Sequence, residues 1–409
     1  MRAFIFLAGL VCLISPVQVM GQGDPLMKNK EGEKEPSIRD KFGNPKESRN
    51  TPVDGRTFDE WVTIIKTSRD EGLVTEAIQA VQLYGADTAI EVIPRLTGML
   101  RRHGVRRQLD TSIRSHAIAA VGNILSNTKE PDLKQINDAL VQFKRMLRDP
   151  EDHVRFKTAL AIAQLGPDAA SLAQYLCNTT IRDPRTWEIR YAATLALGSI
   201  GVDKKNGPNI WSLRGLAYAA EYDTSAEVRV TAVRAITYLG PPKGEDMALR
   251  KSLRDALLNA ISDKHVPVRI WANMALMNLD GESDPDRVEA IGNLLDYKER
   301  NVRFQAAHAL AILGVESKSQ VNNLIEALQD EDPEVVLQVM VALGSLKGHG
   351  RPALEKLNSI EKGKDSKGVY LWPWLYRRVA KQTIAAIEGR EMKDGKKKGN
   401  QTSEENNSK

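Results

Sequence analysis

The chain repeats one pattern of apolar and small residues along most of its length. Each copy begins at an apolar anchor, usually followed by arginine, and the anchors are Leu73, Ile113, Val154, Ile189, Val228, Val268, Val302 and Val335. Successive anchors are 33 to 41 residues apart, with alanine seven places after each anchor and aliphatic residues eight and usually eleven places after it. A small residue usually stands four places after the anchor. These offsets lie on one face of a helix with 3.6 residues per turn, so each copy predicts an amphipathic helix.

Glycines and a second set of apolar stretches complete the repeating unit. A glycine stands twelve places after five of the anchors, where a left-handed residue closes a helix without steric cost, at Gly85, Gly166, Gly201, Gly240 and Gly314. Between these helices lie further stretches with helical periodicity, at 136–147, 248–261 and 321–329. The repeating unit is therefore predicted to be a pair of helices.

This pattern resembles the HEAT repeat family, particularly its short bacterial form and the helical repeats of bilin lyases, over residues 57 to 350. The likeness is carried by "DPEDHVRFKTALAIAQLG", "DPRTWEIRYAATLALGSIG" and "DTSAEVRVTAVRAITYLG". It implies an all-α protein, a right-handed α-solenoid of about eight HEAT-like helical pairs with a C-terminal capping helix. It also implies that the Val-Arg helix of each pair lines the concave side.

The two ends of the chain differ in composition from the repeats. Residues 1–21, with one early arginine and a short apolar run from Ala3 to Ile14, are expected to be a secretory signal peptide cleaved near Gly21. Residues 22–56 are rich in charge and proline and predict a disordered linker, as residues 390–409 predict a disordered polar tail. Folding is expected to span 57–389, from a capping box at Thr57 and Glu60 to a closing helix within 369–389 that begins after Pro373.

A cleaved signal peptide has consequences for the mature protein. It would be exported to the periplasm or the extracellular space without a transmembrane segment. Cys177 would be its single cysteine, which excludes an intramolecular disulfide and favours a buried, inert thiol.

The charge of the chain gives little support to nucleic-acid binding. The formal net charge is +5, but the predicted solenoid carries only about +3, too little for a surface that follows phosphates. The densest basic cluster, Arg101 to Arg107, is expected to be a solvated loop; an acidic partner, an anionic polymer or a membrane surface is the alternative.

The arginines that follow the anchors form a column through the repeats: Arg114, Arg155, Arg190, Arg229, Arg269 and Arg303. Aspartates precede them by six residues at Asp149, Asp223 and Asp263 and by seven at Asp183. In the family that the sequence resembles, such residues form a ladder between successive repeats. We therefore expect the column to be structural and the aspartates to act also as N-caps. The ladder should end where Val336 replaces the arginine.

Residues for catalysis or metal binding are not evident. The six histidines lie in different repeats, and the sequence contains no HExxH, CxxCH, GxSxG or P-loop motif. The acidic stretch Asp280–Asp286 lacks the glycine and final glutamate of an EF-hand, so calcium is the less favoured interpretation. Asp284 is expected to cap a helix that begins at Pro285. We predict no catalytic residue, no metal and no cofactor.

The remaining candidate is a binding surface. The resemblance implies that positions two, three, six and ten after each anchor face the concave side. The second position is apolar in six successive copies, at Phe156, Tyr191, Val230, Ile270, Phe304 and Leu337. The candidate partner-binding residues are Phe156, Lys157, Tyr191, Arg234, Tyr238, Ile270, Trp271, Phe304, His308 and Leu337. If neighbouring helices cover this column instead, it belongs to the core.

The favoured function is a non-enzymatic exported scaffold that binds a protein or peptide along its concave side. The alternative is an enzyme of HEAT-like architecture, since bilin lyases and alkyl-base DNA glycosylases resemble this fold, or a binder of an anionic polymer or membrane surface through basic loops. The sequence identifies neither the partner nor the oligomeric state.

Overall fold

The computed structural model describes residues 49–100, 111–178, 180–203, 207–244, 246–363 and 371–390. The predicted signal peptide, most of the predicted linker, the Arg101–Arg107 cluster and residues 391–409 lie outside these ranges. The chain divides into two compact units, residues 1–279 and 280–409. Each unit is described by itself below.

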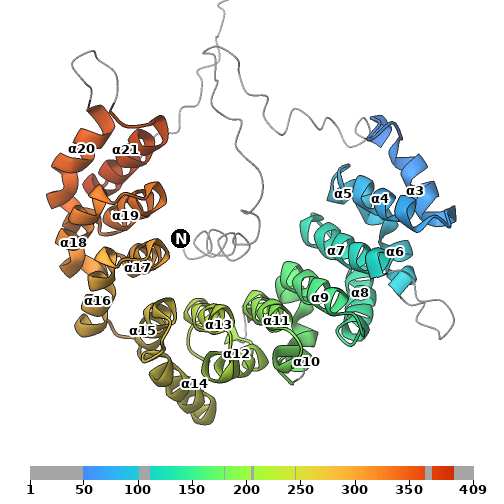
Figure 1. Cartoon of the computed structure of the whole chain (residues 1–409), viewed down its shortest axis with the longest axis horizontal. Coiled ribbons are helices and arrows are strands. Elements are labelled where there is room, and N and C mark those ends of the chain that lie inside the picture. Colours follow the sequence, from blue (N-terminus) through green and yellow to red (C-terminus); the bar gives the residue numbers. More distant parts are fainter. Residues whose placement is uncertain are drawn as a thin grey trace, which may run out of the picture. The chain divides into compact units, whose positions relative to one another are not determined.

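The first unit contains two rows of helices (Figure 1). One row carries the anchors and is called the Val-Arg row; its helices are α4 (Glu71–Gln82), α7 (Thr111–Asn127), α9 (Asp152–Leu165), α11 (Trp187–Ile200), α13 (Ala226–Leu239) and α15 (Val266–Asp280), whose last residue begins the second unit. The second row contains α3 (Phe58–Thr67), α6 (Ile93–Leu100), α8 (Leu133–Met146), α10 (Ala173–Asn178), α12 (Ile210–Tyr222) and α14 (Met247–Ala260). Short connections are α5 (Ala86–Ala89) and the 3₁₀ turns η2 (Ile90–Val92), η3 (Gly166–Leu172) and η4 (Thr180–Arg182).

One small sheet interrupts the helices of the first unit. Strands β1 (Val202–Asp203) and β2 (Gly207–Pro208) pair antiparallel, with Val202 opposite Pro208. The sheet joins α11 to α12, and both residues of β2 are buried. The fold is otherwise all-α, as the sequence predicts.

The second unit continues the same alternation. Its Val-Arg row consists of α17 (Arg300–Leu313) and α19 (Pro333–Ser345). Its second row contains α16 (Pro285–Gly292), α18 (Val321–Glu326) and α20 (Leu354–Lys362), with 3₁₀ segments η5 (Asn293–Asp296), η6 (Gly314–Gln320), η7 (Ala327–Gln329) and η8 (Lys347–Ala353). The helix α21 (Trp374–Glu388) follows Pro373 and packs against α19 and α20, which confirms the predicted closing helix. Each unit is thus a segment of an α-solenoid.

The predicted helix-ending glycines adopt positive φ, but their backbone is not the expected left-handed helical turn. Gly166 has φ 57° and ψ −126°, and Gly314 has φ 58° and ψ −126°. This combination of φ and ψ is accessible essentially to glycine alone. It turns the chain out of α9 and α17 directly into the 3₁₀ segments η3 and η6.

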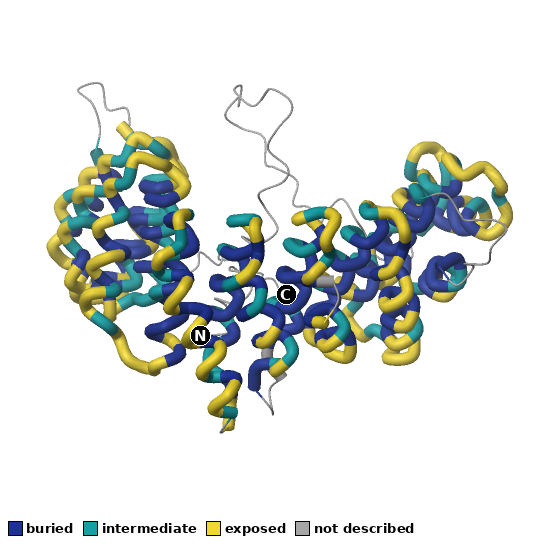
Figure 2. The backbone as a smooth tube through the Cα atoms, turned by 60° about the horizontal axis from the view of Figure 1, so that its bottom comes forward, coloured by how far each residue is buried: buried dark blue, intermediate teal, exposed yellow. Residues whose placement is uncertain are grey.

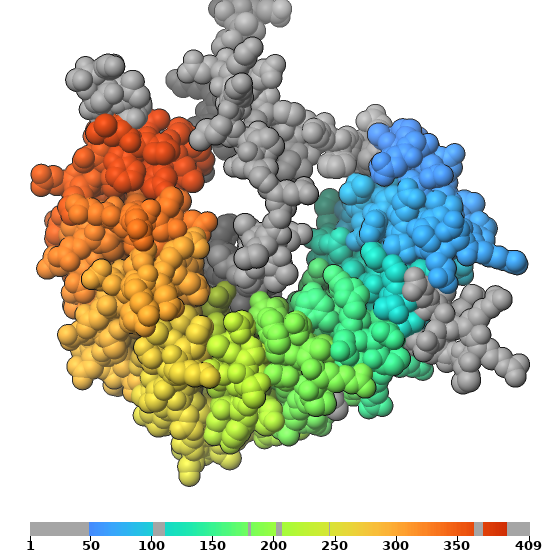
Figure 3. Space-filling model, viewed as in Figure 1, coloured from blue at the N-terminus to red at the C-terminus, as the bar shows by residue number. Residues whose placement is uncertain are grey.

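The core is formed between consecutive helices. In the first unit α7 packs against α9, α9 against α11, and α11 against α13. The alanines seven places after the anchors are all at most 5% exposed, because they lie where these helices approach one another. Figure 2 shows the buried residues along the middle of each helix, and in Figure 3 the colours follow one another within each unit without mixing. Each helical pair is therefore covered mainly by its neighbours in the sequence.

The folded part of the first unit begins earlier than the predicted boundary at Thr57. Arg49 forms ion pairs with Asp59 at 2.5 Å and Glu91 at 2.9 Å. The indole Nε1 of Trp61 donates to the carbonyl of Val53 at 3.0 Å. Residues 49–56 thus supply charge and backbone acceptors to the first helices, which a composition rich in charge and proline does not indicate. The capping box is confirmed, since the backbone N–H of Thr57 donates to the Glu60 carboxylate at 2.7 Å.

Within the part of the chain that the structure describes, no helix is both long enough and apolar enough to cross a membrane.

Candidate functional site

The arginine column forms the predicted ladder between repeats. Arg190 on α11 donates from Nε and Nη2 to the two carboxylate oxygens of Asp223, at 2.7 and 3.0 Å, and Arg229 on α13 binds Asp263 in the same way, at 2.6 and 3.0 Å. Equivalent pairs join Arg114 to Asp149, Arg155 to Asp183 and, in the second unit, Arg303 to Asp330. These five arginines therefore bind the aspartate of the following repeat through charge-assisted hydrogen bonds. For Arg269, the sixth of the predicted column, the structure shows a hydrogen bond from Nη1 to the Asp263 carbonyl of its own repeat, at 3.1 Å, and no such pair among the described residues.

The same arginines also fix the loop of their own repeat. Nη1 of Arg229 donates to the backbone carbonyl of Asp223 at 2.9 Å, and Nη1 of Arg155 to that of Asp149 at 2.7 Å. Because these guanidinium groups bind both the next repeat's aspartate and their own repeat's backbone, their role is structural. Among the described residues the last rung is Arg303–Asp330, consistent with the expected end at Val336.

The ladder aspartates are not N-caps, contrary to the sequence prediction. The N-cap residues of α9, α11 and α13 are Glu151, Thr186 and Ser225. Each ladder aspartate instead accepts the backbone N–H two residues further on, as Asp223 does from Ser225 at 2.8 Å. This Asx turn lies just before the helix and leaves the rest of the carboxylate for the arginine.

In the first unit, three candidate residues on α9 and α11 are partly accessible. Phe156 and Lys157 on α9 and Tyr191 on α11 are half-buried. The ring of Tyr191 meets that of Trp187 edge to face, with centroids 6.2 Å apart, and Trp187 is 41% exposed. Burial raises the pKa of the Tyr191 hydroxyl, and the charge of Arg234 opposes this rise. Tyr191 and Trp187 together form an aromatic ledge at the start of α11.

The candidates on α15 do not line an open surface. Ile270 and Trp271 are fully buried, and Arg234 on α13 is 9% exposed. The Trp271 ring lies 5.9 Å from the Tyr238 ring and 5.5 Å from the Arg234 guanidinium carbon. The preceding helix therefore covers Trp271, and its large indole is part of the packing between repeats. Tyr238 is half-buried.

Sequence reasoning missed Trp187 as part of this surface. It stands two places before its anchor, where no other copy of the pattern has an aromatic residue. Aligning the copies position by position would have revealed it.

In the second unit, Phe304, His308 and Leu337 are half-buried. The rings of Phe304 and His308 on α17 stack with centroids 6.3 Å apart and an angle of 10° between them. His308 Nδ1 lies 3.2 Å from Nε2 of Gln338 on α19. The structure thus brings these candidates to one side of α17 and α19, where Val341 is 50% exposed.

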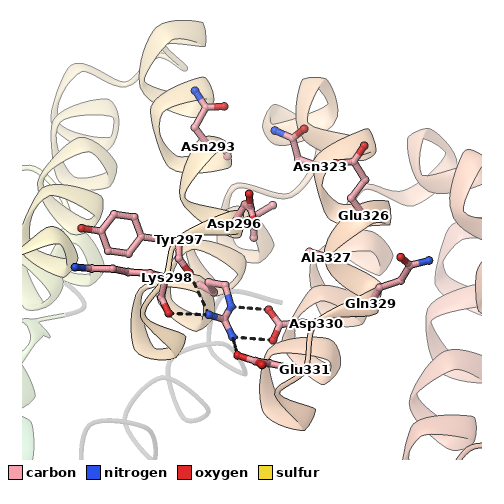
Figure 4. Close-up of a pocket in the computed structure, with 13 residues that line it drawn as sticks. Asn293, Asp296, Tyr297, Lys298, Asn323, Glu326, Ala327, Gln329, Asp330 and Glu331 are labelled. Atoms are coloured by element: carbon pink, nitrogen blue, oxygen red, sulfur yellow. Dashed lines mark hydrogen bonds and ion pairs between the residues drawn. The ribbon is translucent and has the colours of Figure 1, made fainter.

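The second unit also contains a polar pocket of about 750 Å³ between successive repeats (Figure 4). Asn293 lies on one side, and Asn323 and Glu326 on the other. The ladder pair Arg303–Asp330 borders it, with Glu331 accepting a further hydrogen bond from Arg303 at 3.4 Å. The charges that line the pocket near Arg303 are therefore already used to join the two repeats.

The described residues assemble no evident reactive centre. No group of three or more His, Cys, Asp or Glu side chains in the described ranges is placed to hold a metal ion. Asp284 caps α16 by accepting the N–H groups of Asp286 and Arg287, which confirms the predicted cap. Cys177 is buried, and burial raises the pKa of its thiol, which disfavours the reactive thiolate.

Three solved structures resemble the chain at TM-scores below 0.5, and we draw no conclusion from them. An engineered protein is 20% identical with a TM-score of 0.42 and covers 84% of this chain and 93% of its own. Yeast importin-β (Kap95p) is 14% identical with a TM-score of 0.47, covering 82% of this chain and 47% of its own. The CpcE–CpcF complex of phycocyanin lyase from Nostoc sp. PCC7120 is 17% identical with a TM-score of 0.35, covering 73% and 96%.

No curated protein matches the chain. Residues 213–311, from α12 to α17, match the sequence model of HEAT repeats. This match shows HEAT repeats within residues 213–311, where the structure has helical pairs and the Arg229–Asp263 ion pair.

Proposed function

We propose that the chain is a non-enzymatic, exported HEAT-repeat scaffold that binds a protein or peptide along the Val-Arg row. One observation carries the proposal: Phe156, Tyr191 and Val230 hold the same position on α9, α11 and α13, and all three are half-buried. Apolar side chains that recur in register without being fully covered are typical of a surface for a partner.

The aromatic ledge supports a specific contact. Trp187 and Tyr191 supply two large rings at the start of α11, and Phe156 lies on the neighbouring helix α9. Tryptophan and tyrosine bury large areas at a low cost in side-chain entropy, so they often dominate the energy of an interface. The half-buried Phe304 and Leu337 extend the proposal to the second unit.

Export is the part of the proposal that depends on the sequence alone. A fusion of residues 1–48 to alkaline phosphatase, which is active only outside the cytoplasm, tests it. Enzyme activity in the exported fraction is expected. Retention of the fusion in the cytoplasm would contradict export and favour the enzymatic or nucleic-acid alternatives.

The binding surface is tested by the double variant Phe156→Ala, Tyr191→Ala in a crosslinking pull-down from the native cell envelope. Loss of two aromatic anchors should weaken partner binding by about 2–4 kcal/mol. The matched control is Val141→Ala, Leu258→Ala, which truncates residues 52% and 40% exposed on the second row. Binding is expected to survive in the control.

Stability separates a binding surface from a core. Denaturant unfolding of the double variant should change little compared with its loss of binding. If each truncation instead lowers the free energy of unfolding by about 3–5 kcal/mol, the residues are part of the packing and the proposed surface is wrong.

A further inference from the structure

Arg234 differs from the ladder arginines in having no acidic partner among the residues that the structure describes. It lies on α13, five residues after Arg229, and only 9% of it is exposed. Its Nε and Nη2 atoms are buried, and neither hydrogen-bonds any residue that the structure describes. Arg229, in contrast, uses all three guanidinium nitrogens. A buried donor without an acceptor is rare in folded proteins, and a buried charge without a counter-charge is strongly unfavourable.

Aromatic rings surround the guanidinium group of Arg234. The Trp271 ring centroid is 5.5 Å from its carbon, and Tyr238 packs on Trp271. Tyr191 on α11 is near enough for the charge of Arg234 to act on its hydroxyl. Ring faces attract a cation, but they do not accept the N–H groups in the plane of the guanidinium. The planar donor edge of Arg234 therefore remains available to an anion.

The helices around Arg234 carry no competing acid on this face. At positions two, three, six and ten after the anchors, helices α7, α9, α11, α13 and α15 have no Asp or Glu, although the chain contains 53 of them. Cations at these positions are Arg234 and Lys157, with His116 as a third titratable group. The nearest acid on α13 is Glu227, which accepts a hydrogen bond from Ser225 at 2.8 Å. The face is thus complementary to negative charge.

We infer that Arg234 binds a carboxylate of an acidic peptide segment in the partner protein, and that Tyr191 on α11 and Phe156 on α9 receive the apolar side chains of the same segment. This inference rests on the proposed function and specifies its chemistry. The planar fork of arginine matches a carboxylate with two parallel hydrogen bonds. A nucleic acid or other polyphosphate would require a continuous row of cations, whereas this face alternates cations with aromatic and aliphatic residues.

Access to Arg234 requires a small movement. Tyr191 on the preceding helix and Tyr238, one turn further along α13, are half-buried side chains on the same face. Rotation of a partly exposed side chain is fast and leaves the helices in place. The partner would thus complete the hydrogen bonds of Arg234 without unfolding the repeat.

The test uses the whole chain and 3-phenylpropionate, which combines an aromatic ring with a carboxylate; 3-phenylpropionamide is the uncharged control. Affinity for so small a molecule should be roughly millimolar. The carboxylate is expected to raise the melting temperature and to shift the NMR signal of the Arg234 Nε–H group, and the amide is expected to do neither. An unresponsive Nε–H signal overturns the inference, as does a larger response to inorganic phosphate than to the carboxylate.

Variants separate a binding arginine from a structural one. Arg234→Met should melt at or above the temperature of the parent protein, because it removes an unpaired buried charge, and should lose the response to 3-phenylpropionate. Arg214→Met, at an arginine 48% exposed on α12, is the control that keeps the response. A lower melting temperature for Arg234→Met, or a response that survives in it, overturns the inference.

Two further measurements keep the outcomes distinct. If Arg234→Met does not fold, Arg234→Gln replaces it, and the Nε–H signal of the parent protein decides the question without any variant. If the pull-down depends on Phe156 and Tyr191 while 3-phenylpropionate has no effect, the scaffold proposal survives and the carboxylate site fails.

Discussion

At the scale of single residues, small side chains set the distance between repeats. A Cβ atom added to Gly122 on α7 would lie 2.7 Å from Ala161 Cβ and 2.9 Å from Ala161 Cα on α9. Gly98 on α6 has no atom within 4 Å of the corresponding position. Two glycines in helices thus have different roles, and only the first is required by packing.

This difference gives a paired prediction. Gly122→Ala should force α7 and α9 apart and lower the free energy of unfolding by about 1–3 kcal/mol. Gly98→Ala should raise it by about 0.5–1 kcal/mol, because alanine favours a helix over glycine. Urea unfolding of both variants checks the prediction. Equal effects of the two substitutions would show that α7 and α9 can move apart without a loss in the free energy of unfolding.

The candidate site shows what a residue pattern alone does not reveal. The offsets from the anchors place Phe156 and Trp271 alike on one side of their helices, yet Phe156 is half-buried and Trp271 fully buried. The difference depends on the neighbouring helix, since Tyr238 and Arg234 cover the indole. The unpaired state of Arg234 is likewise invisible in the sequence, because it is defined by the absence of acids from other helices.

At the scale of helices, periodicity predicts the elements well. The predicted second helices at 136–147 and 248–261 correspond to α8 and α14, and the stretch 321–329 forms α18 followed by the 3₁₀ turn η7. Composition predicts the start of the fold less well, since residues 49–56 look like linker. Apart from the ion pairs of Arg49, their contribution comes from backbone carbonyls, which every sequence supplies.

The segment 49–56 gives a prediction about truncation. The Tyr84 hydroxyl is 2.9 Å from the carbonyls of Thr51 and Arg56, and Trp61 binds Val53. A chain beginning at Thr57 should lose about 1–3 kcal/mol for each of the two donors left without an acceptor. Thermal unfolding is compared with that of a chain beginning at Arg49, which keeps these contacts. Identical melting temperatures would mean that the segment does not stabilise the fold.

At the scale of the whole molecule, we expect local stability to differ from one group of repeats to another along the chain. Each repeat is covered by its neighbours, so a change at one end is expected to weaken nearby repeats first. The helix α21 covers α19 and α20, and the hydroxyl of Thr383 donates to the carbonyl of Met340 at 3.1 Å.

Deletion of residues 371–390 tests this division. It would expose the fully buried Met340 and Leu343. Hydrogen exchange is expected to become faster in α17, α19 and α20 and to remain unchanged in α7, α9 and α11, because the latter belong to the other compact unit. Faster exchange throughout the chain would indicate a single cooperative unit.

The Arg–Asp ladder has a direction, since in each of its five rungs among the described residues the arginine reaches forward to the aspartate of the next repeat. The first copy of the pattern has Val74 and Ser68 where later copies have the arginine and the aspartate, and the last has Val336 in place of the arginine. If the first and last repeats had the same contact residues as the inner repeats, the end of one molecule could bind the start of another. Such head-to-tail contacts do not form a closed ring and produce an open filament. Because neither of these two repeats offers the missing half of a rung, a second copy of the chain is not expected to extend the ladder.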